Sequence, residues 1–261
     1  MALGLSFVVG VIGNVVSVLV FLAPVKTFWR IVRTRSTEEF QSFPYVCTLL
    51  SSALWTYYGI IKAGAYLVAT VNGFGIVAES VYVILFLVYA PQKSKINTAA
   101  MVGALDIGVL AGLILATGLG MKGDIRIDVV GFMCAGLNIV MYGSPLAAMR
   151  TVVRTRSVEY MPFFLSFFLL LNGGIWSLYA LLVVDYFLLV PNGIGFLLGI
   201  AQLVLFAIYR NAKPVNITRN TSTSLEDGLS QGDDNDREPL ISPSNYDHQQ
   251  HPASSSSSGH V

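Results

Sequence analysis

Hydrophobic residues lie in long continuous runs that are separated by short polar segments. A helix needs about 20 mostly apolar residues to cross a bilayer. Seven runs meet this requirement, at residues 5–26, 43–61, 66–90, 98–119, 127–149, 161–184 and 187–209. None of them shows the alternation of apolar and polar residues that is typical of a membrane β-barrel strand. The pattern therefore predicts an all-α membrane protein with seven transmembrane helices.

The chain also contains an internal repeat. The segment Pro24–Ser36 returns 121 positions later as Pro145–Ser157, and Asn72–Gly75 returns 120 positions later as Asn192–Gly195. Four further residues of the first half have identical counterparts at the first of these spacings: Leu49, Leu50, Trp55 and Tyr58 return as Leu170, Leu171, Trp176 and Tyr179. Repeated halves with a substrate site between them are common among transporters.

The order of the spans predicts how the halves are related. One span, 98–119, separates them, so both begin on the same side of the membrane and are parallel, related by an axis along the membrane normal. We therefore expect a 3+1+3 arrangement. It consists of a first three-helix repeat at 5–90, a linker helix at 98–119, a second repeat at 127–213 and a disordered cytosolic tail at 214–261, which is rich in Ser, Asn and Asp.

Charged residues make up only 12% of the chain, but their distribution predicts an orientation. The loops after the first, third and fifth spans and the start of the tail carry Lys26, Arg30, Arg33, Arg35, Lys93, Lys95, Arg150, Arg154, Arg156, Arg210, Lys213 and Arg219. The loops on the other side carry only Lys62, Lys122 and Arg126. The positive-inside rule then puts the C-terminus in the cytosol. The first span lacks a basic n-region and a cleavage site, so we expect it to be retained.

Other functional classes find little support in the sequence. The two cysteines, Cys47 and Cys134, lie inside predicted spans and suggest neither a disulfide framework nor a metal site. All three histidines lie in the tail, so no catalytic arrangement, cofactor or nucleic-acid partner is expected. A seven-helix receptor remains an alternative, but a receptor does not require a 3+1+3 repeat. The tail also contains Asp236–Ile241, a pattern similar to a dileucine sorting signal.

These features resemble the plant SWEET sugar transporters. The resemblance rests on the 3+1+3 spans, paired prolines, RS-x-E after the first and fifth spans and Asn-Gly in the third and seventh, and it covers about residues 5–213. This family is itself an example of parallel repeats. The runs SFFLLLNGGIW and AIYRNAKP are similar to the vacuolar-membrane subgroup that handles fructose and glucose. The resemblance implies bidirectional hexose uniport by alternating access, contact with lipid and sometimes small homo-oligomers, with sucrose transport or proton coupling as alternatives.

Repeated polar residues inside the spans are the candidate sugar ligands. Asn72 and Asn192 lie about five residues inside their spans, beside glycines, and an amide offers both donors and an acceptor to sugar hydroxyls. Trp55 and Trp176 provide flat rings, with Ser51 and Asn172 four residues earlier. The same spacing adds the pairs Ser17 with Asn138 and Val20 with Met141. The resemblance places these pairs in the pocket wall, where Asn138 and Asn172 narrow the cavity and favour a monosaccharide.

Two further sets of residues are candidate gates. Pro24, Pro44, Pro145 and Pro162 lie at the predicted cytosolic helix ends, where proline ends or kinks a helix. On the other face, Tyr58, Lys62 and Asp185 can close a lumenal gate by hydrogen bonding. Glu79 is buried in the third span, but its counterpart is Gly199. We therefore expect Glu79 to make a structural hydrogen bond, and we favour uniport over proton coupling.

Overall fold

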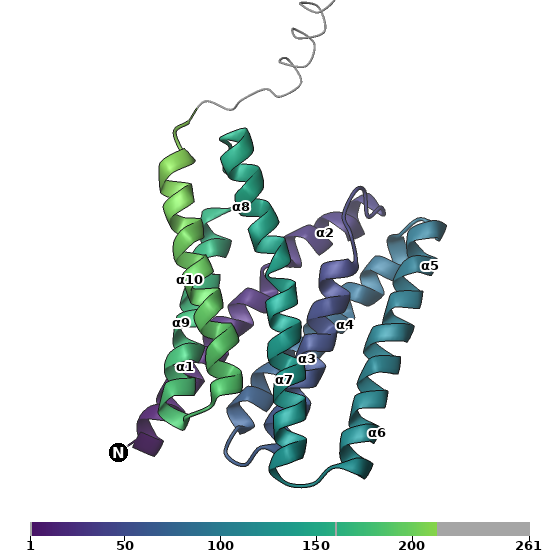
Figure 1. Ribbon diagram of the computed structural model, residues 1–261. Coiled ribbons are helices and arrows are strands. Elements are labelled where there is room, and N and C mark those ends of the chain that lie inside the picture. Colours follow the sequence, from purple (N-terminus) through teal and green to yellow (C-terminus); the bar gives the residue numbers. More distant parts are fainter. Residues whose placement is uncertain (1, 160, 213–261) are drawn as a thin grey trace, which may run out of the picture. The chain divides into compact units, whose positions relative to one another are not determined.

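The structure, a computed structural model, describes residues 2–159 and 161–212, and all regular secondary structure in this part of the chain is helical (Figure 1). The chain divides into two units, Met1–Val215 and Asn216–Val261, and the second lies outside the described residues together with the predicted tail signal. The helices are α1 (Ala2–Leu22), α2 (Val25–Thr34), α3 (Phe43–Ile61), α4 (Tyr66–Tyr89), α5 (Gln92–Met101), η1 (Val102–Val109), α6 (Leu110–Gly120), α7 (Asp124–Met141), α8 (Gly143–Thr155), α9 (Phe163–Val183) and α10 (Tyr186–Tyr209).

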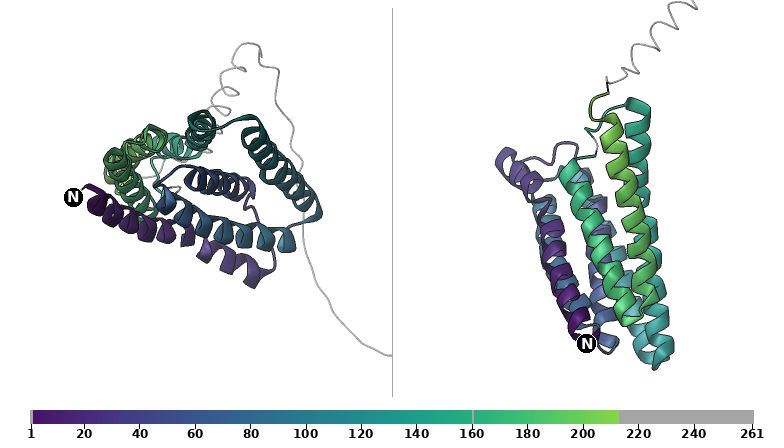
Figure 2. Two further views of the ribbon diagram at one scale, coloured as in Figure 1. Left: turned by 90° about the horizontal axis from the view of Figure 1, so that it is seen from below. Right: turned by 90° about the vertical axis from the view of Figure 1, so that its left-hand side faces the viewer.

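The helices pack in two similar groups of three. In the first, α4 packs against both α1 and α3, and in the second, α10 packs against both α7 and α9. The groups meet through two equivalent contacts, α1 with α9 and α7 with α3. The view along the helices shows the groups side by side, with the linker helix beside the first (Figure 2). The predicted 3+1+3 arrangement is therefore confirmed.

Six helical segments within the described residues are long and apolar enough to cross a membrane. The predicted span that is not among these six is 43–61, which corresponds to α3. Helix α3 carries Ser51, Ser52, Tyr57 and Tyr58, so its mean hydropathy is lower than that of the other spans. Nine of its 19 residues are buried, which places α3 inside the bundle rather than at its surface. Three of its polar side chains bond to other helical segments, since Ser51, Tyr57 and Tyr58 contact Asn138, Thr117 and Asp185.

The first and fifth spans extend further than the sequence predicted. Helix α1 breaks at Ala23–Pro24 and continues as α2 to Thr34, and α7 turns at Tyr142 and continues as α8 to Thr155. Helix α2 buries Phe28 and Ile31 while its other face carries basic residues. An amphipathic segment of this kind lowers the average hydropathy, so the predicted spans ended early, at residues 26 and 149.

The linker span is one continuous helical segment from Gln92 to Gly120, with a π-helical middle, η1. Two hydrogen bonds attach it to α3: Ser42 Oγ lies 2.6 Å from Thr98 Oγ1, and Tyr57 Oη lies 2.9 Å from Thr117 Oγ1. These bonds join the two ends of the linker to the first group of helices. The linker therefore packs with the first half of the repeat.

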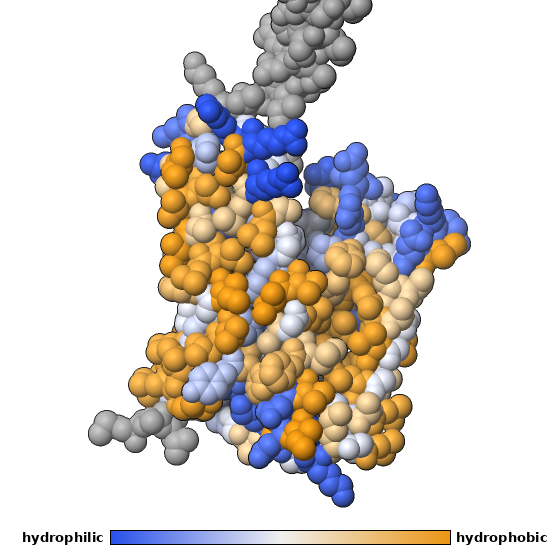
Figure 3. Space-filling model, viewed as in Figure 1, coloured by the Kyte–Doolittle hydropathy of each residue, from blue (hydrophilic) through white to orange (hydrophobic). Residues whose placement is uncertain are grey.

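The surface of the described helices has an apolar band between two polar ends (Figure 3). We call the end that carries α2 and α8, with their arginines, the basic end, and the end that carries the α3–α4 and α9–α10 turns the gate end. Side chains in the band such as Val77, Phe132 and Leu197 are more than 60% exposed. Exposed apolar side chains over a band of this kind fit a lipid environment, and the protein is an integral membrane protein.

Candidate substrate-binding site

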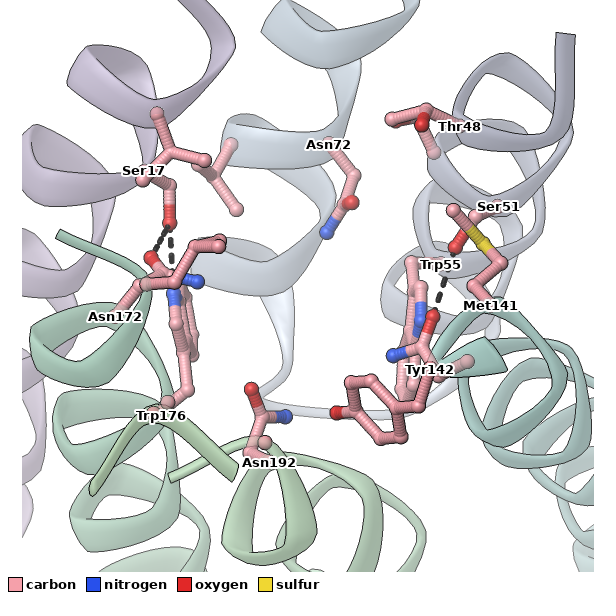
Figure 4. A pocket seen from close by; sticks show the side chains of 18 of the residues that line it. Ser17, Thr48, Ser51, Trp55, Asn72, Met141, Tyr142, Asn172, Trp176 and Asn192 are labelled. Carbon is pink, nitrogen blue, oxygen red and sulfur yellow. Dashed lines mark hydrogen bonds between the residues drawn. The ribbon is translucent and has the colours of Figure 1, made fainter. Parts of the chain in front are cut away.

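A cavity of about 380 Å³ lies between the two groups of helices (Figure 4). Its wall includes all ten candidate ligands from the sequence: Ser17, Val20, Ser51, Trp55, Asn72, Asn138, Met141, Asn172, Trp176 and Asn192. Each repeat contributes one member of every pair. The volume falls in the range that small-molecule sites usually have. The central cavity is thus built from the same positions in both halves.

Asn72 from α4 and Asn192 from α10 approach the central cavity from different sides (Figure 4). Each amide donates one hydrogen bond to the carbonyl four residues earlier, Asn72 to Val68 at 2.9 Å and Asn192 to Leu188 at 2.8 Å. An amide group has two donors and one carbonyl acceptor. Each side chain is therefore held in place by its own helix and keeps one N–H and one carbonyl oxygen for a ligand.

The two indole rings line the central cavity from α3 and α9. Trp55 packs edge-on against Tyr58 at 5.4 Å between centroids, and Trp176 packs in the same way against Tyr179 at 5.3 Å. The Trp176 Nε1 donates to Ser17 Oγ at 2.8 Å, on α1, rather than to Asn172 four residues before it. The polar group at the edge of this ring thus comes from the other half of the repeat.

Two equivalent hydrogen bonds cross between the halves beside the central cavity. Ser17 Oγ donates to Asn172 Oδ1 at 2.5 Å, and Ser51 Oγ donates to Asn138 Oδ1 at 3.0 Å. The repeat relates these bonds to one another, because it exchanges Ser17 with Asn138 and Ser51 with Asn172. Each asparagine therefore turns its carbonyl toward a serine, and the amide nitrogen of Asn172 remains beside the cavity (Figure 4).

A further pair of aromatic residues, not predicted from the sequence, lies in the cavity wall. Phe21 and Tyr142 are 121 positions apart, and both line the central cavity. A Cβ atom at Gly75 would lie 2.5 Å from the Phe21 ring, and one at Gly195 would lie 2.7 Å from the Tyr142 hydroxyl. The second glycine of each Asn-Gly-x-Gly motif therefore makes room for the aromatic residue of its own half, which the repeat spacing could have revealed.

A polar cluster of Tyr58, Lys62 and Asp185, of which Tyr58 and Asp185 are buried, links the two halves at the gate end. The Tyr58 hydroxyl donates to the Asp185 carboxylate, at 3.0 Å from both oxygens, and accepts from Lys62 Nζ at 2.8 Å. Lys62 Nζ also lies 2.7 Å from Asp185 Oδ2. Asp185 caps the N-terminus of α10 through the backbone N–H of Leu188. The cluster joins α3 of one half to α10 of the other.

The four candidate gate prolines occupy two kinds of position. Pro24 lies at the break between α1 and α2, and Pro145 lies in the first turn of α8, where it lines the central cavity. Pro44 and Pro162 lie at the starts of α3 and α9, where proline suits a helix N-terminus. Between the halves, the surface at the basic end is hollowed (Figure 3).

Two carboxylates in the spans lie outside the wall of the central cavity. Glu79 is 3% exposed, and its Oε2 has no hydrogen-bond partner among the described residues. The structural hydrogen bond expected for Glu79 stays a prediction. Asp106 lies in η1, and neither of its carboxylate oxygens has a partner within the described ranges. Neither group is in a position to bind a ligand in the central cavity.

A 3+1+3 membrane fold, with a cavity lined by asparagine and tryptophan side chains between parallel repeats, defines a membrane transporter of the alternating-access class. A family model described as "Sugar efflux transporter for intercellular exchange" matches residues 7–94 and 128–214, which are the two repeats without the linker. The chain belongs to this family, as its resemblance to the SWEET transporters predicted. The family consists of transporters and not of enzymes.

Individual relatives agree with this assignment. The chain is 58% identical to the bidirectional sugar transporter SWEET17 of Arabidopsis thaliana, over 85% of this chain and 92% of the relative. It is 61% identical to SWEET16 of the same plant, over 81% and 92%. Among solved structures, a eukaryotic SWEET transporter matches with a TM-score of 0.76 and 38% identity, over 78% of this chain and 96% of that one.

Proposed function

We propose that this protein is a bidirectional uniporter that carries monosaccharides such as fructose and glucose across a membrane by alternating access. The observation that carries the proposal is the central cavity, where Asn72 and Trp55 of the first repeat are matched by Asn192 and Trp176 of the second. Amide groups suit sugar hydroxyls, and the indole rings suit the apolar C–H face of a sugar ring. The relatives that are named bidirectional sugar transporters support the same substrate class.

The state of the gates supports alternating access. The gate end is closed by Tyr58, Lys62 and Asp185, while the wall of the central cavity continues toward the basic end through Thr48, Pro145 and Gln202. In one state of a rocking transporter, the central cavity is closed at one end and continues toward the other end, as it does here. The four prolines, which lie at or near helix starts on the basic end, are the proposed hinges of the second gate.

A monosaccharide is favoured because of the size of the residues around the central cavity. The side chains of Asn138 and Asn172 bond to serines of the other half beside the cavity and fill space that a smaller residue would leave open. We further propose the vacuolar membrane as the location, with the C-terminus in the cytosol, from the resemblance to the vacuolar subgroup and from the arginines at the basic end. Surrounding lipid and a second copy of the chain are the proposed partners.

Uptake by proteoliposomes that contain the purified protein tests the proposal. Radiolabelled fructose and glucose should enter faster than into empty vesicles, and preloaded sugar should leave at a comparable rate. Sucrose, offered at the same concentration, should enter much more slowly. A preference for sucrose would contradict the size argument, and uptake of no sugar at all would contradict the transport proposal.

A further inference from the structure

A second cavity, of about 430 Å³, lies at the gate end, outside the closed gate. Three segments form this outer cavity: Ser6 and Phe7 at the start of α1, residues 62–67 around the α3–α4 turn, and residues 179 and 182–185 at the end of α9. It shares Lys62 and Asp185 with the gate, but no residue lines both this cavity and the central one. The gate therefore separates two distinct cavities.

Tyr179 is the residue that suggests a ligand in the outer cavity. It is the repeat counterpart of Tyr58, is only 3% exposed, and its ring is held against Trp176. The Tyr58 hydroxyl has hydrogen bonds to Lys62 and Asp185, whereas no hydrogen bond of the Tyr179 hydroxyl is found within the described residues. A tyrosine hydroxyl can donate and accept a hydrogen bond, so the Tyr179 hydroxyl is available to a molecule in the outer cavity.

The chemistry of the lining indicates a neutral molecule with many hydroxyl groups. Lys62 and Asp185 already neutralise one another at 2.7 Å, so the outer cavity presents no unpaired charge from this pair to a charged ligand. Both groups, together with the Tyr179 hydroxyl, can still exchange hydrogen bonds with hydroxyl groups. The remaining wall is largely apolar and includes Phe7 and Leu182. A sugar ring has both kinds of surface.

We propose that the outer cavity is a second monosaccharide-binding site, occupied before the sugar passes the gate. The inference rests on the proposed transport of sugars. A sugar hydroxyl that bonds to Lys62 or Asp185 takes the place of a bond that now closes the gate, because both residues belong to the gate and to the cavity wall. Occupation of the outer site thereby favours opening of the gate beneath it.

Photoaffinity labelling of the purified full-length protein tests this inference. The probe is a hexose that carries a small diazirine group, and the labelled residues are mapped by mass spectrometry. Label is expected both in the central cavity and in the outer one, at residues 62–67 or 182–185, and an excess of unlabelled hexose should remove both. Tyr179→Phe keeps the packed ring and should reduce outer labelling roughly fivefold, the effect of losing one hydrogen bond, with central labelling unchanged.

Two further variants separate the sites. Asn72→Ala should reduce central labelling and leave outer labelling, while Tyr89→Phe, which removes a hydroxyl far from both cavities, should change neither. Central labelling without outer labelling, or outer labelling that Tyr179→Phe or excess hexose does not reduce, would overturn the second site. If the unmodified protein showed neither central labelling nor sugar uptake, the result would instead contradict the proposed function.

Discussion

At the scale of single residues, the central cavity combines fixed and available hydrogen-bonding groups. Asn72 and Asn192 each use one N–H for the carbonyl four residues earlier, so their orientation is set before a ligand arrives. Groups that are already held in place lose little conformational freedom on binding. This arrangement favours moderate, reversible sugar binding through a few hydrogen bonds, as a transporter that must also release its substrate requires.

Replacing either asparagine with alanine should therefore impair transport. We expect Asn72→Ala and Asn192→Ala each to reduce fructose uptake by roughly tenfold. Each substitution removes hydrogen bonds to the sugar that contribute about 0.5–1.5 kcal/mol of binding free energy apiece, and it leaves a sugar hydroxyl without a partner. The measurement is the initial rate of uptake into proteoliposomes at equal protein content. Asn97→Ala, on the exposed side of α5, is the matched control and should transport normally. Normal uptake by both cavity variants would show that these amides do not bind the sugar.

The asparagines that bridge the halves should limit the size of the substrate. In the double variant Asn138→Ser with Asn172→Ser, both side chains are shortened and the bonds to Ser51 and Ser17 are weakened. We expect the ratio of sucrose to fructose uptake to rise several-fold, because the cavity widens on both sides. An unchanged ratio in a variant that still carries fructose would mean that size is selected elsewhere.

At the scale of helices, close packing around the second glycine of each motif fixes how neighbouring helices meet. A Cβ atom at Gly75 would lie 2.5 Å from Phe21 and 2.7 Å from Ser52 Oγ, whereas one at Gly73 would meet nothing within 4 Å. The two glycines lie only two residues apart, yet one faces a neighbouring helix and the other does not. Conformational freedom of the backbone cannot explain this difference, because both are helical.

Substitution of these two glycines should thus have opposite outcomes. Gly75→Ala should lower the stability of the purified protein by about 1–3 kcal/mol, the usual cost of overpacking, while Gly73→Ala should leave it unchanged or slightly raise it, since alanine is the better helix former. The measurement is the thermal unfolding midpoint in detergent. Equal midpoints for the two variants would contradict the packing of α4 against α1 and α3.

The sequence predicted the spans and the repeat well because both depend on local hydropathy and spacing. The repeat spacing also identified the ten candidate ligands of the central cavity, because each residue could be compared with its counterpart in the other half. It did not predict the hydrogen bond from Trp176 to Ser17, which depends on how α9 is rotated relative to α1. It also missed α2 as a separate helix, because amphipathic segments have low average hydropathy. Contacts between helices that are distant in the sequence are thus the features of the site that residue spacing alone does not predict.

At the scale of the whole molecule, the gate cluster is a polar link between the halves at one end. Lys62→Met should remove the ion pair to Asp185 while leaving the α10 cap in place. We expect faster hydrogen–deuterium exchange in the α3–α4 and α9–α10 turns, because local opening becomes less costly. Lys122→Met, at an exposed lysine outside the gate, is the control. Unchanged exchange in both turns would mean that the cluster does not hold the gate closed.

The energetics of the transport cycle follow from where the titratable groups lie. Proton coupling needs a carboxylate that contacts the substrate or a gate, and Glu79 lines neither cavity, while its repeat counterpart is Gly199. Its Oε2 is buried without a partner among the described residues, which favours the neutral carboxyl in the membrane interior. A carboxyl group that touches neither the substrate nor a gate does not couple proton movement to sugar movement. Sugar flux should then depend on the sugar gradient alone.

We therefore expect uptake in sealed vesicles to be insensitive to a protonophore, and Glu79→Gln, which has nearly the same shape, to keep its transport rate. The measurements are uptake with and without an imposed pH difference, for the unmodified protein and for Glu79→Gln. Asp185 belongs to the gate cluster, where its carboxylate is paired with Lys62 and accepts a hydrogen bond from the first turn of α10. Accumulation of sugar against its gradient, driven by the pH difference and lost in Glu79→Gln, would make Glu79 the coupling residue and replace uniport by proton-coupled transport.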